Sequence, residues 1–268
     1  MRIRACLEWL EADHDIKILY AVESGSRAWD ISSPDSDYDI RFIYVRPRDA
    51  YLGIRRPKDS IDATIGEYDF HGWDITKTCH LASKSNPSLL EWLVSDQRYI
   101  EVGTTADKLR RATREFSAAA LMHHYTSLAK HTWRTYLEAP DKPLLKKYIY
   151  AVRPALCIYY MRQNEYKFPP LNFNSLIANA TEKTLDTFTT DEVCWISVEL
   201  EDLYWRKREA SEADTYCRFP WLDELIGQVV ENGHTWALEA PNNNPDHELL
   251  NVLCQDTTNA YACGHNRF

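Results

Sequence analysis

Glycine and long apolar runs are both scarce in this chain. Only 8 of its 268 residues are glycine, against 9 tryptophans and 16 tyrosines. Few glycines and many large side chains favour helices over open loops. No segment approaches the roughly 18 to 20 apolar residues of a membrane helix. The first residues lead into an amphipathic segment and not into the apolar core of a secretory signal, so we expect no membrane partner.

Paired cysteine motifs are also absent from the sequence. The seven cysteines lie at positions 6, 79, 157, 194, 217, 254 and 263, and none forms a C-x-x-C pair. An odd, scattered set is typical of reduced thiols and not of a disulfide framework or a zinc site. We therefore expect a cytoplasmic protein.

Net positive charge is missing as well, although the acids are unevenly distributed. The formal charge is −9, and residues 181–250 hold 16 acidic and 5 basic side chains. The rest of the chain is slightly basic, and residues 141–170 carry six Lys or Arg against two acids. A local basic segment can bind phosphate even on an acidic protein. A solvated helix face explains the same charges equally well.

The hydrophobic pattern changes along the chain and predicts an α+β fold. An amphipathic helix is expected over residues 3–12, and strands over 16–22, 38–45 and 64–75. From residue 106 the pattern is almost entirely helical. We therefore predict a mixed sheet with flanking helices over residues 1–105 and a helical domain over residues 106–268, with the boundary near Gly103.

Several signals refine the helical half. Thr189 with Glu192 is a capping-box start, and Pro154 inside an apolar helical pattern predicts a kink or a helix start. The segment from 241 to 268 is polar, with a short helical patch near Leu249. The expected helices cover 107–136 (as one or two), 144–164, 189–208 and 220–230.

A glycine–serine pair follows the first predicted strand. Gly25 permits close backbone approach, and Ser26 adds a hydroxyl donor. If a helix begins there, its first N–H groups can meet an anion. On its own, such a pair at a turn is most often structural.

Two carboxylates open the second predicted strand, twelve residues after Gly25. Side chains at i and i+2 of a strand share a face, so Asp37 and Asp39 should point the same way, opposite Tyr38 and Ile40. Adjacent carboxylates repel each other unless a cation lies between them. Mg²⁺ takes such oxygen ligands and keeps phosphate oxygens as further ligands.

A third acid is expected on the strand predicted over residues 64–75. Asp74 is our choice, because Trp73 and Ile75 would then point into the core and leave Asp74 on the open face. Asp69 is the rival, and alternation places it on the same side as Trp73. Three carboxylates can hold two Mg²⁺ ions for in-line phosphoryl transfer, with Mn²⁺ as a substitute.

In this order, these residues resemble the signature of the polymerase-β-like nucleotidyltransferases. That signature has Gly-Ser after a strand, then Asp-x-Asp about a dozen residues later, then a third acid. More narrowly, the sequence looks like the predicted nucleotidyltransferases found with RNA ligases in RNA-repair gene clusters. This resemblance covers about residues 18–100 and continues loosely to Arg153; it rests on Gly25–Trp29, Ser33–Asp39, Trp73–Ile75 and Asn86-Pro87 with Glu91-Trp92.

The resemblance implies a role for each residue. Asp37, Asp39 and Asp74 would be the catalytic metal ligands, with Asp74 activating the acceptor hydroxyl. Gly25 and Ser26 would bind the β- and γ-phosphates of an NTP. Further phosphate contacts are expected from Arg27, Lys146, Lys147 and Arg153.

The acceptor is the open part of the prediction. Family context favours an RNA 3′ end, with tRNA the favoured RNA. The acidic chain suggests contact with a terminus and not a long RNA footprint, because affinity for a nucleic-acid backbone needs many Lys or Arg contacts. A protein or small-molecule acceptor, a toxin–antitoxin role and a non-catalytic nucleotide-binding module stay as alternatives. The sequence does not distinguish between NTPs.

Overall fold

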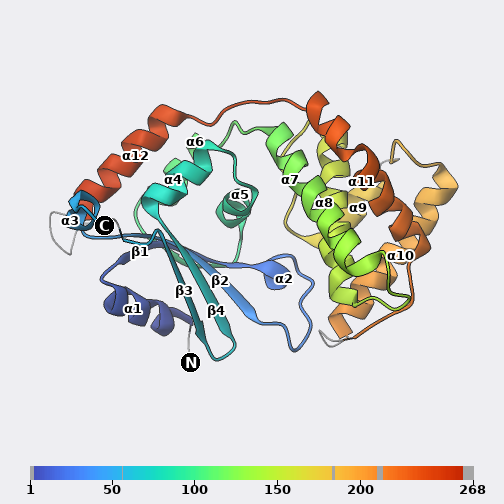
Figure 1. Cartoon of the computed structure of the whole chain (residues 1–268), viewed down its shortest axis with the longest axis horizontal. Coiled ribbons are helices and arrows are strands. Elements are labelled where there is room, and N and C mark those ends of the chain that lie inside the picture. Colours follow the sequence, from blue (N-terminus) through green and yellow to red (C-terminus); the bar gives the residue numbers. More distant parts are fainter. Residues whose placement is uncertain (1–2, 56, 183–184, 210–213, 262–268) are drawn as a thin grey trace. The chain divides into compact units, whose positions relative to one another are not determined.

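The computed structural model describes residues 3–55, 57–182, 185–209 and 214–261. These residues form two compact units, each built from separate stretches of chain (Figure 1). The first unit takes in the described residues of Met1–Ala28, Asp37–Ser117 and Asn243–Phe268, and the second takes in those of Trp29–Ser36 and Ala118–Asn242. In the described part of the chain, no helix is long and apolar enough to cross a bilayer.

A five-stranded mixed sheet forms the centre of the first unit. Its strand order is β3-β4-β2-β1-β5, with β2 and β4 parallel and the other neighbours antiparallel. This agrees with the predicted α+β class. The strands are β1 (Lys17–Ser24), β2 (Tyr38–Val45), β3 (Ser60–Ile65), β4 (Tyr68–Asp74) and β5 (Arg98–Glu101).

Each face of the sheet has its own apolar cluster. Helix α1 (Ile3–His14) covers one face, where its leucines pack against Phe42 and Phe70. On the other face, Trp73 stacks on Trp92 with ring centroids 3.8 Å apart. The helices on that face are α4 (Ile75–Ser83), α5 (Pro87–Val94), α6 (Thr105–Ala112) and α12 (His247–Ala260). Two short helices complete the unit, α2 (Gly25–Ala28) and α3 (Arg48–Leu52).

The second unit is helical. Its buried central helix is α8, which packs against α7, α9, α10 and α11. Helix α8 begins at Leu145 and continues through Pro154, so Pro154 lies inside a helix and does not mark a helix start. The helices are α7 (Ala118–Thr132), the π-helical turn η1 (Trp133–Leu137), α8 (Leu145–Gln163), α9 (Phe173–Glu182), α10 (Thr190–Glu209) and α11 (Pro220–Glu239).

The predicted capping box at the start of α10 is confirmed. The Glu192 carboxylate accepts from the Thr189 N–H at 2.7 Å, and the Glu192 N–H donates to the Thr189 hydroxyl at 3.4 Å. The reciprocal bonds satisfy backbone donors that a helix start otherwise leaves open. The Thr189 N–H and the Thr189 hydroxyl both donate to the Glu192 carboxylate, and these two bonds lower its pKa.

The segment predicted as one strand over residues 64–75 is two strands. Gly66 has φ +64° and turns the chain between β3 and β4. A positive φ is accessible to glycine without the strain that a side chain adds. β3 and β4 then pair along their whole length.

The units also differ from the contiguous domains expected at 1–105 and 106–268. The stretch 29–36 belongs to the helical unit, and the chain returns to the sheet unit at Asn243. Leu250 and Leu253 of α12 join the apolar cluster beside α4 and α6. The predicted polar tail therefore supplies part of a core as far as it is described; residues 262–268 lie outside the described residues.

Candidate active site

The sheet brings the glycine–serine pair beside the second carboxylate. In the antiparallel pairing of β1 with β2, Ser24 lies opposite Asp39, and Gly25 and Ser26 follow as the first residues of α2. Gly25 has φ +61°, and a Cβ atom at this position would lie 2.1 Å from Asp39 Oδ2. Only glycine fits, because its backbone is in direct contact with the carboxylate.

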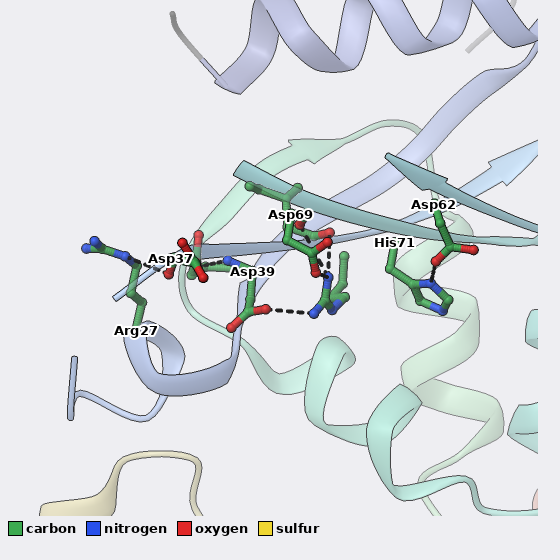
Figure 2. A network of polar contacts seen from close by, with 9 residues as sticks. Arg27, Asp37, Asp39, Asp62, Asp69 and His71 are labelled. Carbon is green, nitrogen blue, oxygen red and sulfur yellow. Dashed lines mark hydrogen bonds and ion pairs between the residues drawn. The ribbon is translucent and has the colours of Figure 1, made fainter. Parts of the chain in front are cut away.

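A second acid lies next to Asp39 on the neighbouring strand. The parallel register of β2 and β4 pairs Asp39 with Asp69, and both side chains interact with Arg41. The Arg41 guanidinium donates to Asp39 Oδ1 at 2.7 Å and to Asp69 Oδ2 at 2.8 Å. Figure 2 shows the two aspartates on adjacent strands. A cation therefore already lies between two carboxylates at this end of the sheet.

Asp37 stands one residue before β2 and is exposed. Its backbone carbonyl accepts from Arg27 Nε at 3.2 Å, and the same guanidinium lies 3.7 Å above the centre of the Tyr38 ring. Figure 2 shows Arg27 close to Asp37. Arg27 was expected to meet phosphate; here it also supports the entry of the chain into β2.

The predicted place of Asp74 is wrong. Asp74 is 2% exposed and forms the N-cap of α4, accepting from the Thr76 N–H at 2.8 Å and from the Tyr51 hydroxyl at 2.7 Å. In the sheet it pairs with Tyr44, five residues along β2 from Asp39. Asp74 therefore lies at the opposite end of the strands from the aspartate pair.

The prediction for Asp74 failed because it assumed that helices cover the whole sheet face to which Trp73 points. Alternation along β4 does place Asp69 on the same side as Trp73. That side is covered by α4 and α5 only around Trp73, where Trp73 stacks on Trp92. At the Asp69 end the same face carries polar side chains. The rival residue that the sequence offered is the one beside Asp39.

Glu23 holds the backbone of Asp39 and was not predicted from the sequence. Its fully buried carboxylate accepts from the Asp39 N–H at 2.8 Å and from the Tyr99 hydroxyl. Burial raises the pKa of Glu23. No sequence signal marks this residue, since it looks like the polar end of a buried strand.

An acid–histidine pair continues the polar face. His71 lies two residues after Asp69 on β4, and its Nδ1 is bonded to Asp62 of β3 (Figure 2). The ring of His71 also meets Trp73 edge to face. The alternation of side chains along β3 and β4 places Asp62 and His71 on the same face. The sequence could show this only if β3 and β4 were recognised as two separate strands.

The predicted basic residues of α8 belong to the helical unit. The guanidinium of Arg153, which is 4% exposed, lies 4.1 Å from the centre of the Trp29 ring. Lys147 Nζ lies 3.9 Å from the centre of the Tyr136 ring. Lys146 Nζ is 6.0 Å from the Tyr150 ring. The burial of Arg153 favours a role in holding Trp29 over direct contact with phosphate.

Further cations of the helical unit contact the loop that precedes Asp37. The ammonium group of Lys207, only 2% exposed, donates to Ser33 Oγ at 2.8 Å. Arg208 binds the Asp30 carboxylate at 3.2 Å. Both come from α10, far along the chain, so nothing in the local sequence linked them to this loop. The loop is covalently continuous with Ala28 on one side and Asp37 on the other.

The donor chemistry at the aspartates suits a hard cation. Asp37, Asp39 and Asp69 offer only carboxylate oxygens, which Mg²⁺ and Mn²⁺ prefer. Within the described ranges, no three His, Cys, Asp or Glu side chains are grouped closely enough to hold an ion. The Arg41 guanidinium lies between two of the three carboxylates, those of Asp39 and Asp69.

Comparison with known proteins agrees with the family that the sequence signature resembles. The family described as RlaP, RNA repair pathway DNA polymerase beta family, matches residues 1–256. The uncharacterized protein YcgL of Bacillus subtilis (strain 168) is 38% identical over 231 residues, which cover 84% of this chain and 83% of YcgL. The chain therefore belongs to the RNA repair pathway DNA polymerase beta family.

Proposed function

We propose that this protein is a nucleotidyltransferase that moves a nucleoside monophosphate from an NTP to the terminal 3′ hydroxyl of an RNA, with tRNA the favoured acceptor. The observation that carries the proposal is the pairing of Asp39 with Asp69 on one sheet face, with Gly25 packed against Asp39. Membership of an RNA repair family supports the RNA acceptor.

The carboxylates would act together as ligands of the two divalent ions. Asp37, Asp39 and Asp69 are the proposed ligands, and Asp69 takes the part first given to Asp74. When bound, Mg²⁺ or Mn²⁺ would neutralise phosphate charge and lower the pKa of the acceptor hydroxyl. Arg41 would have to release at least one carboxylate for the ligands to close around an ion.

The backbone around Gly25 would hold the triphosphate. Gly25 contacts the Asp39 carboxylate directly, and Gly25 and Ser26 are the first residues of α2. Phosphate oxygens bound there would therefore share a site with the metal ligands, as in-line phosphoryl transfer needs. Lys146 and Lys147 are further proposed contacts for the triphosphate, as half-buried ammonium groups in the helical unit.

The test is transfer of label from each α-³²P NTP to RNA, in Mg²⁺ or Mn²⁺. Two acceptors of one sequence are used, ending in a 3′ hydroxyl or in a 3′ phosphate. We expect label on the hydroxyl-ended RNA alone, and loss of at least about 100-fold for Asp39→Asn and Asp69→Asn. Label on both RNAs alike would contradict transfer to the 3′ hydroxyl.

Asp74→Asn is the matched control for these variants. Asparagine is as good an N-cap as aspartate, so α4 should keep its start. We expect activity within a few-fold of wild type. If Asp74→Asn lost its activity while Asp69→Asn stayed active, the assignment of Asp69 as the third metal ligand would be overturned. If no RNA is labelled but NTP binds in the presence of metal, the RNA acceptor is ruled out and protein and small-molecule acceptors are tested next.

A further inference from the structure

Two cysteines far apart in sequence meet on the helical side of the sheet unit. Cys79 lies on α4 and Cys254 on α12, and both belong to the same apolar cluster. The two thiols are close enough for each to shift the pKa of the other. Cys79 is 7% exposed, and Cys254 is half-buried. Both helices lie in one unit, so this contact is internal to it.

A cavity gives small molecules access to the thiol pair. It has a volume of about 220 Å³, and both cysteines line it together with His80, His247 and Asn251. A water molecule takes up about 30 Å³ of liquid, so hydrogen peroxide would fit easily. Both sulfurs face this one cavity, and a disulfide would bring them to about 2.05 Å.

We propose that Cys79 and Cys254 form a reversible disulfide when the protein meets a hydroperoxide such as hydrogen peroxide. The Cys254 thiolate attacks one peroxide oxygen, the O–O bond breaks, and hydroxide leaves, so Cys254 becomes a sulfenic acid. The Cys79 sulfur then attacks the Cys254 sulfur, and the S–O bond breaks. The Cys79 proton leaves with that oxygen as water. In total, two thiols are oxidised and one peroxide is reduced to two waters.

The two sulfurs are not equivalent, and this sets the order of attack. The interaction with Cys254, together with burial, raises the pKa of the Cys79 thiol. The same interaction lowers the pKa of Cys254. Cys254 also has the greater exposure. The more exposed sulfur with the lower pKa is the one that reacts first with an oxidant.

The disulfide would fix the returning end of the chain to the sheet unit. The whole of Ala118–Asn242 lies between the two cysteines in sequence. A bond that closes such a long loop restricts the unfolded chain strongly. We expect the oxidised protein to melt about 5 °C or more above the reduced protein.

The experiment treats the full chain with hydrogen peroxide, blocks free thiols with N-ethylmaleimide and maps cross-linked peptides by mass spectrometry. Digestion with trypsin and Asp-N cuts before Asp256 and so separates Cys254 from Cys263. We expect a Cys79–Cys254 peptide pair that dithiothreitol removes. A disulfide to another cysteine, or sulfinic acid at Cys254 with Cys79 still alkylated, would overturn the proposal.

Variants then test the order of attack. With dimedone present, Cys79→Ser should carry an adduct on Cys254, whereas Cys254→Ser should carry none on Cys79. Cys157→Ser and Cys194→Ser, one buried and one exposed in the helical unit, should keep the cross-link. An adduct on Cys79 in Cys254→Ser would contradict the assigned order. The wild-type peptide map stands as a test even if a serine variant fails to fold.

Discussion

At the scale of single residues, the candidate site depends on contacts that leave no room for change. Gly25 adopts φ +61° against the Asp39 carboxylate, and the Glu23 carboxylate accepts a hydrogen bond from the Asp39 N–H. Arg41 joins Asp39 to Asp69. Gly25 and Arg41 contact the Asp39 carboxylate and Glu23 holds the Asp39 backbone, so small substitutions here should affect chemistry more than folding.

Replacing Gly25 by alanine should remove activity. The new Cβ would lie 2.1 Å from Asp39 Oδ2, so the carboxylate must move by about 1 Å or more, and such a displacement can cost about 100-fold in rate. Nucleotide transfer and urea unfolding would both be measured. Gly66→Ala is the control: it has a similar φ of +64° but nothing within 4 Å of the added atom. Equal activity loss in both variants would show that backbone strain alone is responsible.

Replacing Arg41 by alanine should increase the affinity for Mn²⁺. Without the guanidinium, Asp39 and Asp69 face each other uncompensated, and a divalent ion relieves their repulsion. We expect the rise in Tm caused by Mn²⁺ to be larger in Arg41→Ala than in wild type, and Arg41→Lys to be intermediate. An unchanged or smaller rise in Arg41→Ala would mean that Arg41 does not compete with metal.

At the scale of helices and strands, the packing of α7 against α11 relies on a missing side chain. Gly233 of α11 faces Thr126 of α7, and a Cβ atom there would lie 2.4 Å from Thr126 Oγ1. Threonine is stiff about its first torsion and cannot easily turn away. The two helices therefore approach more closely than any larger residue would allow.

Two glycines of α11 should respond in opposite ways to alanine. Gly233→Ala should lower the free energy of unfolding by about 1–3 kcal/mol through overpacking. Gly227→Ala, where nothing lies within 4 Å of the added atom, should raise it by up to about 1 kcal/mol through helix propensity. Urea denaturation of both variants gives the sign directly. Stabilisation by Gly233→Ala would mean that the helices separate at little cost.

At the scale of the whole chain, the sheet unit is completed by its last described helix. Leu253 is 1% exposed in the core beside α4, whereas its neighbour Val252 is 45% exposed. Leu253→Ala should therefore cost about 2–5 kcal/mol of unfolding free energy, and Val252→Ala no more than about 0.5 kcal/mol. Equal, small losses in urea unfolding would show that α12 contributes nothing to the unit.

The overall charge sets a second expectation at this scale. With a net charge of −9, the protein should contact only the end of an RNA strand. Three or four phosphate contacts on a single strand give a slope of about −2 to −3 in a plot of log affinity against log salt. Fluorescence anisotropy of a labelled RNA measures this slope. A slope steeper than about −5 would indicate an extended RNA footprint.

The sequence by itself determined the local features of this protein. The order of Gly25-Ser26 and Asp37-Tyr38-Asp39, the strand over 38–45 and the capping box at Thr189 all follow from neighbours a few residues apart. Strand periodicity, turn chemistry and helix capping act over such distances. The edge strand β5 escaped prediction, and α12 is longer than the short helical patch predicted near Leu249, because each is stabilised by partners far away in the chain.

Only the tertiary structure decided which acid lies beside Asp39. Asp69 and Asp74 are both aspartates of one strand. The parallel register with β2 places Asp69 beside Asp39, whereas Asp74 becomes the N-cap of α4. The same holds for Lys207 at Ser33 and for Cys254 at Cys79. Pairing register and helix packing join residues that are distant in sequence, and no local pattern encodes which of them will meet.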